Sequence, residues 1–135
     1  MSINIVAEQE FHVGDPIEIE GAAPEGPFAV MFEDDGDTGY FYALDVSQSD
    51  DVIRDAVHIY NVGNVTEREK PSVIEIGWSL DSKKAVLLIN AYPHAIFDFE
   101  ARRGYCRTGF PPAAQHKDWS ADGHSWNEAA IGLFA

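Results

Sequence analysis

The chain has 135 residues, of which 45% are hydrophobic and 24% are charged. This length is typical of one domain spanning residues 1–135, and the composition is that of a globular protein and excludes an intrinsically disordered one. The formal net charge of −14 comes from 23 acidic and 9 basic residues. Such a field repels nucleic acid and anionic lipid and attracts basic proteins.

The negative charge is concentrated in the first 55 residues. Residues 1–32 hold six acids and no Lys or Arg, and residues 33–55 hold eight acids and one base, Arg54. In residues 56–135, nine acids are nearly balanced by eight bases. The acidic part is therefore either a solubilising surface or a surface that binds a basic partner.

The first residues of the chain and its cysteine content indicate the cellular compartment of the protein. The first ten residues, MSINIVAEQE, have neither the basic segment nor the apolar segment of a secretory signal. No apolar run approaches the roughly 20 residues of a membrane helix. The single cysteine, Cys106, excludes an internal disulfide framework and suits a reducing compartment. We therefore expect a cytoplasmic protein that does not bind membranes.

The first predicted elements are two strands and an acidic turn. Residues 28–32 and 40–44 are apolar on both faces, as in central strands, and Gly36 and Gly39 give the intervening loop its backbone freedom. The periodicity of Val52–Val62 leaves two interpretations open. It forms one long strand with Ile53, Val57 and Ile59 inward, or it begins with a helical turn.

Three further strands follow. Residues 73–80 alternate with period two, residues 85–91 form a nearly continuous apolar run, and residues 95–99 alternate again. The segment between Arg102 and Trp126 has no period. We expect it to be an ordered loop, because Phe110, Trp119 and Trp126 need burial.

The end of the chain predicts a helix. Residues 125–128, Ser-Trp-Asn-Glu, match a capping box and precede an apolar run. The predicted fold class is therefore α+β, with a mostly antiparallel β-sheet of about six to eight strands and one or two short helices, including a C-terminal helix.

Several long motifs resemble a known family. They are VMFEDDGDTGYFYALD, DAVHIYNV, GWSLDSKKAVLLINAYPHAIFDF, RRGYCRTGFPP and HSWNEAAIGLF. Together they are similar to the uncharacterised bacterial family DUF2251, with a likeness that extends from about Phe28 to Phe134. The resemblance implies no activity, cofactor or catalytic residue.

Four carboxylates crowd the predicted hairpin turn: Glu33, Asp34, Asp35 and Asp37. A calcium loop that starts at Asp34 would place Gly36 at its third position, where an oxygen ligand is required, so calcium binding is not predicted. Asp and Gly favour turns, and adjacent like charges stay ionised at low cost only in water. The cluster is therefore either a solvated turn or a docking loop for a basic partner.

A second candidate site lies in the last third of the chain. Cationic side chains near Cys106 would lower the pKa of its thiol, but no cysteine-enzyme signature surrounds it, and a buried structural thiol is the favoured interpretation. The scattered histidines fit no zinc spacing, and no metal or cofactor is predicted. Residues that would line a pocket there are Arg102, Arg107, Cys106, His116 and Trp119.

Two hypotheses of function follow. The first is a non-enzymatic, acidic interaction protein that binds a basic protein partner, similar by analogy to immunity proteins that inhibit toxin nucleases. The alternative is a small ligand-binding domain or enzyme, with a pocket formed by the Arg102–Trp126 loop. The sequence does not define the oligomeric state, the strand order or any substrate.

Overall fold

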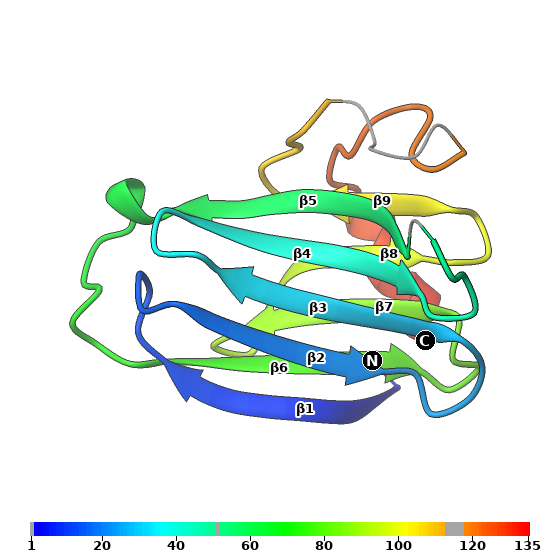
Figure 1. The fold of residues 1–135 in the computed structure, drawn as a ribbon, viewed down its shortest axis with the longest axis horizontal. Coiled ribbons are helices and arrows are strands. Elements are labelled where there is room, and N and C mark those ends of the chain that lie inside the picture. Colours follow the sequence, from blue (N-terminus) through cyan, green and yellow to red (C-terminus); the bar gives the residue numbers. More distant parts are fainter. Residues whose placement is uncertain (1, 51, 113–117) are drawn as a thin grey trace.

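The computed structural model describes residues 2–50, 52–112 and 118–135. Within them, nine strands form two antiparallel sheets that pack face to face as a β-sandwich (Figure 1). The predicted mostly antiparallel β-sheet fold is confirmed, but the described residues form nine strands instead of about six to eight, and two of the nine precede residue 28, where no strand was expected. In the described residues, no helix is long and apolar enough to cross a membrane.

Each sheet combines strands from separate parts of the chain. The five-stranded sheet has the order β1 (Ile3–Phe11), β6 (Ser72–Ser79), β7 (Lys84–Ile89), β8 (Tyr92–Asp98) and β9 (Arg103–Cys106). The four-stranded sheet has the order β2 (Ile17–Ala22), β3 (Phe28–Asp34), β4 (Thr38–Asp45) and β5 (Ile53–Asn61). At the two sides of the sandwich, β1 lies beside β2 and β9 beside β5.

The strand predictions hold with three corrections. The hairpin of β3 and β4 has the expected register, from Phe28 opposite Asp45 to Asp34 opposite Gly39. The segment after residue 52 is one strand, β5, but Ile53 is 36% exposed instead of inward. A bulge between β4 and β5 makes Asp55, and not Ile53, the first buried residue of β5.

The other two corrections concern the last third. The region expected to be a loop contains β9, a strand of four residues paired with β8. The C-terminal helix is only a 3-10 helix, η2 (Glu128–Phe134), and its N-cap is Asn127 instead of Ser125. Ser125 instead forms a β-bridge with Cys106, and the Asn127 side chain caps η2 by accepting from the Ala129 amide. A second 3-10 helix, η1 (Val62–Asn64), follows β5.

Aromatic side chains dominate the core between the sheets. Phe41 of β4 stacks on Phe97 of β8 with ring centroids 5.1 Å apart. Trp78 is fully buried, and its indole N–H donates to the Gly21 carbonyl at 3.2 Å. A Cβ at Gly21 would lie 2.7 Å from a methyl carbon of Ile76, so glycine permits this close approach of the two sheets.

The two outer faces of the sandwich differ. Ala130 and Phe134 of the C-terminal segment pack on Val86, Leu88 and Ile96, on the outer face of the five-stranded sheet. The amide of Ser2 also donates to the Phe134 carbonyl at 2.6 Å, which connects the two ends of the chain. No described segment lies across the outer face of the four-stranded sheet, which is turned towards the viewer in Figure 1.

Candidate functional site

Asp34, at the end of β3, is buried. It is 1% exposed, and its Oδ2 atom accepts hydrogen bonds from the Gly14 amide and the Tyr60 hydroxyl, both at 2.7 Å. Its Oδ1 atom accepts from the Gly36 amide at 2.8 Å. These donors compensate for the desolvation of the carboxylate. The expectation of a fully solvated acidic loop is therefore wrong at Asp34, which joins the β1–β2 turn to the β3–β4 turn and β5.

The other three carboxylates of the cluster are accessible to solvent to different degrees. Asp35 and Asp37 are exposed at the tip of the turn, and Glu33 is half-buried on the outer side of β3. Asp35 Oδ1 accepts from the amides of Asp37 and Thr38, both at 2.9 Å. These backbone hydrogen bonds lower the pKa of Asp35. The cluster thus divides into one structural carboxylate and three surface carboxylates.

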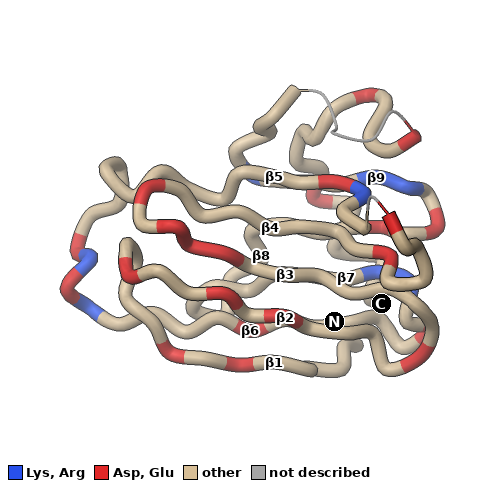
Figure 2. The backbone as a smooth tube through the Cα atoms, in the orientation of Figure 1, with Lys and Arg blue, Asp and Glu red and all other residues tan. Residues whose placement is uncertain are grey.

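We call the outer side of β2–β5 the open face. The buried residues of these strands, such as Phe32, Phe41 and Val57, point into the core, so their neighbours point outward. The register then aligns Glu18, Glu33, Tyr40 and His58 in one row across the sheet. A second row contains Glu20, Met31, Tyr42 and Ala56. Neither row contains Lys or Arg, and Figure 2 shows acidic but no basic positions along β2, β3 and β4.

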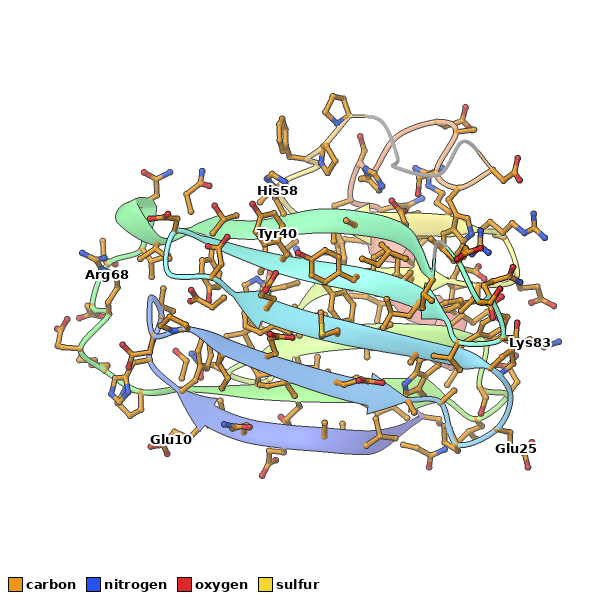
Figure 3. The ribbon with its side chains drawn as sticks, viewed as in Figure 1. Glu10, Glu25, Tyr40, His58, Arg68 and Lys83 are labelled. Atoms are coloured by element: carbon orange, nitrogen blue, oxygen red, sulfur yellow. The ribbon has the colours of Figure 1, made fainter. Side chains whose placement is uncertain are left out.

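The rings of the open face form a continuous series. Tyr40 and Tyr42 stack with centroids 5.8 Å apart, and the His58 ring meets Tyr40 edge-on at 4.9 Å. Figure 3 shows Tyr40 and His58 close together on β4 and β5. Phe110 continues the series at 4.8 Å from His58. Phe110 was expected to be buried, but it is 51% exposed because it packs on the outer side of β5.

A groove adjoins the end of this series. It has a volume of about 570 Å³. Its lining is formed by the end of β5, by η1 and its flank, and by the segment after β9: His58, Ile59, Tyr60, Asn61, Asn64, Val65, Thr108 and Phe110. The groove and the rings share His58 and Phe110, so they form one continuous surface.

The structure brings together only two of the residues predicted to line a pocket in the last third. Arg102 and Trp119 line a cavity of about 290 Å³ at one end of the sandwich, which we call the end cavity. Its other lining residues are Phe28, Asp45, Gln48, Arg54, Phe99 and Asp118. Cys106 and Arg107 lie elsewhere, and His116 is outside the described residues.

Cys106 is buried between the two sheets. It is 1% exposed, and its Sγ atom donates to the His58 carbonyl at 3.1 Å and contacts the Thr108 hydroxyl at 3.3 Å. Burial raises the pKa of the thiol, which outweighs the opposing hydrogen bonds around Thr108. A protonated, enclosed thiol is a poor nucleophile, which supports the packing role.

Cys106 should therefore react slowly with a thiol reagent. At neutral pH we expect labelling of the native protein to be at least about ten-fold slower than labelling of the same protein in denaturant, because the thiol reacts only after local opening. The measurement is the absorbance change with an aromatic disulfide reagent. Native labelling as fast as that of a free thiol would contradict a packing role.

Arg107 is part of an aromatic stack and is not in a pocket. Its guanidinium carbon lies 4.3 Å from the ring centroid of Tyr92 and 4.1 Å from that of Trp126. Its Nε donates to the Pro93 carbonyl at 2.7 Å, and its Nη1 is 3.3 Å from a Glu128 oxygen. Arg107 therefore holds the segment before η2 against β8.

A buried polar cluster, which the sequence did not reveal, lies at β5. The Asp55 carboxylate contacts Nε2 of His124 at 2.8 and 3.0 Å, and it accepts from the Ser120 hydroxyl at 2.6 Å. The Gly104 amide of β9 donates to the Ser120 hydroxyl at 2.8 Å. Nδ1 of His124 faces the Pro111 carbonyl. Asp55, Ser120 and His124 are all at most 3% exposed.

The cluster contains Ser, His and Asp, but it is not arranged as a catalytic triad. In a triad the histidine accepts the serine proton, whereas here both Ser120 and His124 donate to Asp55. Because both ring nitrogens of His124 face acceptors, both carry hydrogen. Burial lowers the pKa of His124, but hydrogen bonds to Asp55 and Pro111 outweigh it and the net shift is upward. This geometry defines a buried ion pair.

The fold and the surface define a β-sandwich with one covered and one open outer face. The chain belongs to the DUF2251 family, described as an uncharacterized protein conserved in bacteria, whose profile matches residues 11–135. The family resemblance of the sequence motifs is thereby confirmed. An uncharacterized protein of Haemophilus influenzae is 39% identical over 121 residues, which cover 89% of this chain and 75% of the relative. No solved structure matches.

Proposed function

We propose that this protein is a non-enzymatic interaction protein that binds a basic protein partner through the open face. The observation that carries the proposal is the difference between the two outer faces. One is covered by Ala130 and Phe134, whereas on the other Tyr, Met and His side chains are partly exposed, and among the described residues Phe110 packs on it at the β5 edge. Aromatic residues and Met are enriched in protein interfaces.

The charge of the open face supports a basic partner. Glu18, Glu20 and Glu33 lie on it, and Asp35 and Asp37 extend the negative charge to the adjoining turn. Opposite charges speed association, and repulsion between like charges disfavours the binding of acidic partners. Of the four residues of the turn cluster, Asp34 is excluded from this surface by its burial. A toxin nuclease, whose substrate-binding surface is basic, has the required chemistry, by analogy with immunity proteins.

Site-specific photo-crosslinking tests the proposal. A photo-reactive phenylalanine analogue replaces Met31 at the centre of the open face, and the matched control carries it at Leu80, which is 70% exposed at the end of β6. In the source cells, we expect the Met31 position to crosslink a basic protein that the Leu80 position does not capture. Because exposed charges are screened within about 8 Å at physiological ionic strength, association of the purified pair should slow as salt increases.

Two results would contradict the proposal. One is the same crosslinked proteins from both positions, which would show random collisions. The other is an acidic partner at the Met31 position, which would show that charge does not select it. Replacing Glu18, Glu20 and Glu33 together with Gln should reduce the association rate, whereas Arg102→Ala, in the end cavity, should leave it unchanged.

The end cavity supports a second candidate function, the binding of a small ligand. Its volume of about 290 Å³ is close to the roughly 300 Å³ at which ligand pockets begin. Guanidinium and carboxylate groups line it together with aromatic rings. If this candidate is correct and the first is not, Arg102→Ala should abolish binding of the small ligand, while the open-face variants should still bind it.

A further inference from the structure

The open face contains rings and carboxylates in the arrangement that recognises a guanidinium group. Glu33 lies directly between Glu18 and Tyr40 in the register, and its Oε1 accepts from the Tyr42 hydroxyl at 2.8 Å. Burial and the neighbouring Glu33 raise the pKa of Tyr42, so the phenol remains neutral. A cation beside the stacked pair Tyr40 and Tyr42 would thus lie close to aromatic rings and to the Glu33 carboxylate.

Within its own fold, the protein already combines a guanidinium group with aromatic rings and a carboxylate. Arg107 lies between Tyr92 and Trp126 at 4.3 and 4.1 Å, and it pairs with Glu128 at 3.3 Å. There the chain supplies the guanidinium group as well as the rings and the carboxylate. On the open face the described residues of the two rows supply only the rings and the carboxylates. Charge complementarity therefore indicates a cation from a partner.

The groove beside the rings selects a second kind of side chain. Its lining includes the apolar side chains of Val65 and Phe110, and its volume of about 570 Å³ is sufficient for a large aliphatic or aromatic side chain. Burial lowers the pKa of His58, so this ring is neutral near pH 7 and does not repel a nearby cation. The rings and the groove meet at His58 and Phe110, so one short segment can contact both.

We infer that the open face binds a protein segment in which an arginine stacks on Tyr40 and Tyr42 and pairs with Glu33, while a neighbouring apolar side chain occupies the groove. The inference rests on the proposed function and specifies the partner's recognition segment. Arginine is preferred to lysine because its planar group stacks on rings and forms two parallel hydrogen bonds with a carboxylate.

Synthetic nonapeptides with a flexible glycine and serine frame test the inference. The parent peptide has a central leucine flanked by arginines, and its two analogues replace the arginines with lysine or the leucine with alanine. Binding is measured by nuclear magnetic resonance, from the changes in chemical shift of Tyr40, Tyr42, His58 and Phe110 as peptide is added. We expect the lysine analogue to bind about three-fold more weakly than the parent, because lysine cannot form the second parallel hydrogen bond of arginine, whose net contribution corresponds to roughly two- to ten-fold in affinity.

Variants of the protein separate recognition from folding. Tyr40→Ser should weaken the parent peptide by about three-fold, whereas Tyr40→Phe, which retains the ring, should bind it as the wild type does. Glu33→Gln should weaken the parent peptide and also reduce the preference for arginine over lysine. Leu80→Ser, away from the open face, should change neither affinity nor preference.

Different outcomes overturn different claims. Equal binding of the arginine and lysine peptides, or shifts centred away from these four residues, would overturn the inference. Equal binding of the leucine and alanine peptides would overturn the role of the groove. None of these results affects the crosslinking comparison between Met31 and Leu80, which tests the proposed function independently.

Discussion

Replacing Asp55 with alanine should lower the free energy of unfolding by about 3–5 kcal/mol, the usual cost of removing one partner from a buried ion pair. The substitution leaves the His124 ring and the Ser120 hydroxyl without their acceptor inside the protein. Since the total stability of a domain is about 5–15 kcal/mol, this loss should be visible as a large shift in a denaturant melt.

Asp55→Asn is the matched control for this prediction. An asparagine oxygen can still accept from Ser120, and its NH₂ group can donate to a neutral His124 ring whose Nδ1 still donates to the Pro111 carbonyl. We therefore expect Asp55→Asn to be clearly less destabilising than Asp55→Ala. If the two variants lose equal stability, the hydrogen bonds of this cluster do not determine the effect.

The same variants provide a second measurement, the dependence of stability on pH. The pKa of His124 is raised above its ordinary value of 6.5, so the folded protein holds this proton more tightly than the unfolded chain does. The stabilisation is complete below about pH 6.5 and is lost as the pH rises through the raised pKa. In the wild type, unfolding free energy should decrease over this interval, and Asp55→Asn should remove that decrease. An unchanged decrease would show that another group is responsible.

The sequence predicted the strands whose periodicity reflects burial. Residues 73–79 alternate because one side of β6 faces the core, and residues 85–89 are continuously apolar because both sides of β7 are covered. Three strands were not predicted: β1, β2 and β9. The four residues of β9, Arg-Gly-Tyr-Cys, include no run of apolar positions. At the C-terminus, Ser125 and Asn127 both have the residue type of a cap. Asn127 is the cap of η2, whereas Ser125 bridges to Cys106, a contact that the local sequence does not show.

The candidate site was predictable only in part, because side-chain neighbours depend on strand order. The acidic turn was located correctly from local residue types, but the burial of Asp34 depends on Gly14 and Tyr60, which are 20 and 26 residues away. His124 is 69 residues from Asp55, in a segment with no period. The ring series of the open face likewise requires the register of β4 against β5. The sequence signal for this ring series was the spacing of Tyr40 and Tyr42, which lie two residues apart and therefore on the same side of β4.

Replacing Asp34 with alanine should cost about 2–4 kcal/mol, because hydrogen bonds to a charged acceptor contribute roughly 1.5–3 kcal/mol each and their loss is only partly additive. The change leaves the Gly14 and Gly36 amides and the Tyr60 hydroxyl without their acceptor. Tyr60→Phe, which removes one of the three donors, should cost about 1–2 kcal/mol. Chemical denaturation of both variants provides the measurement.

Asp37→Ala is the matched control, since Asp37 is an exposed carboxylate of the same turn. A surface substitution of this kind usually changes stability by no more than about 0.5 kcal/mol. Both variants remove one negative charge, so a purely electrostatic role of the cluster would give them similar effects. We expect the opposite pattern, in which Asp34→Ala lowers stability and Asp37→Ala instead slows association with the basic partner. Equal stability losses would mean that the turn acts as one unit and that Asp34 has no separate structural role.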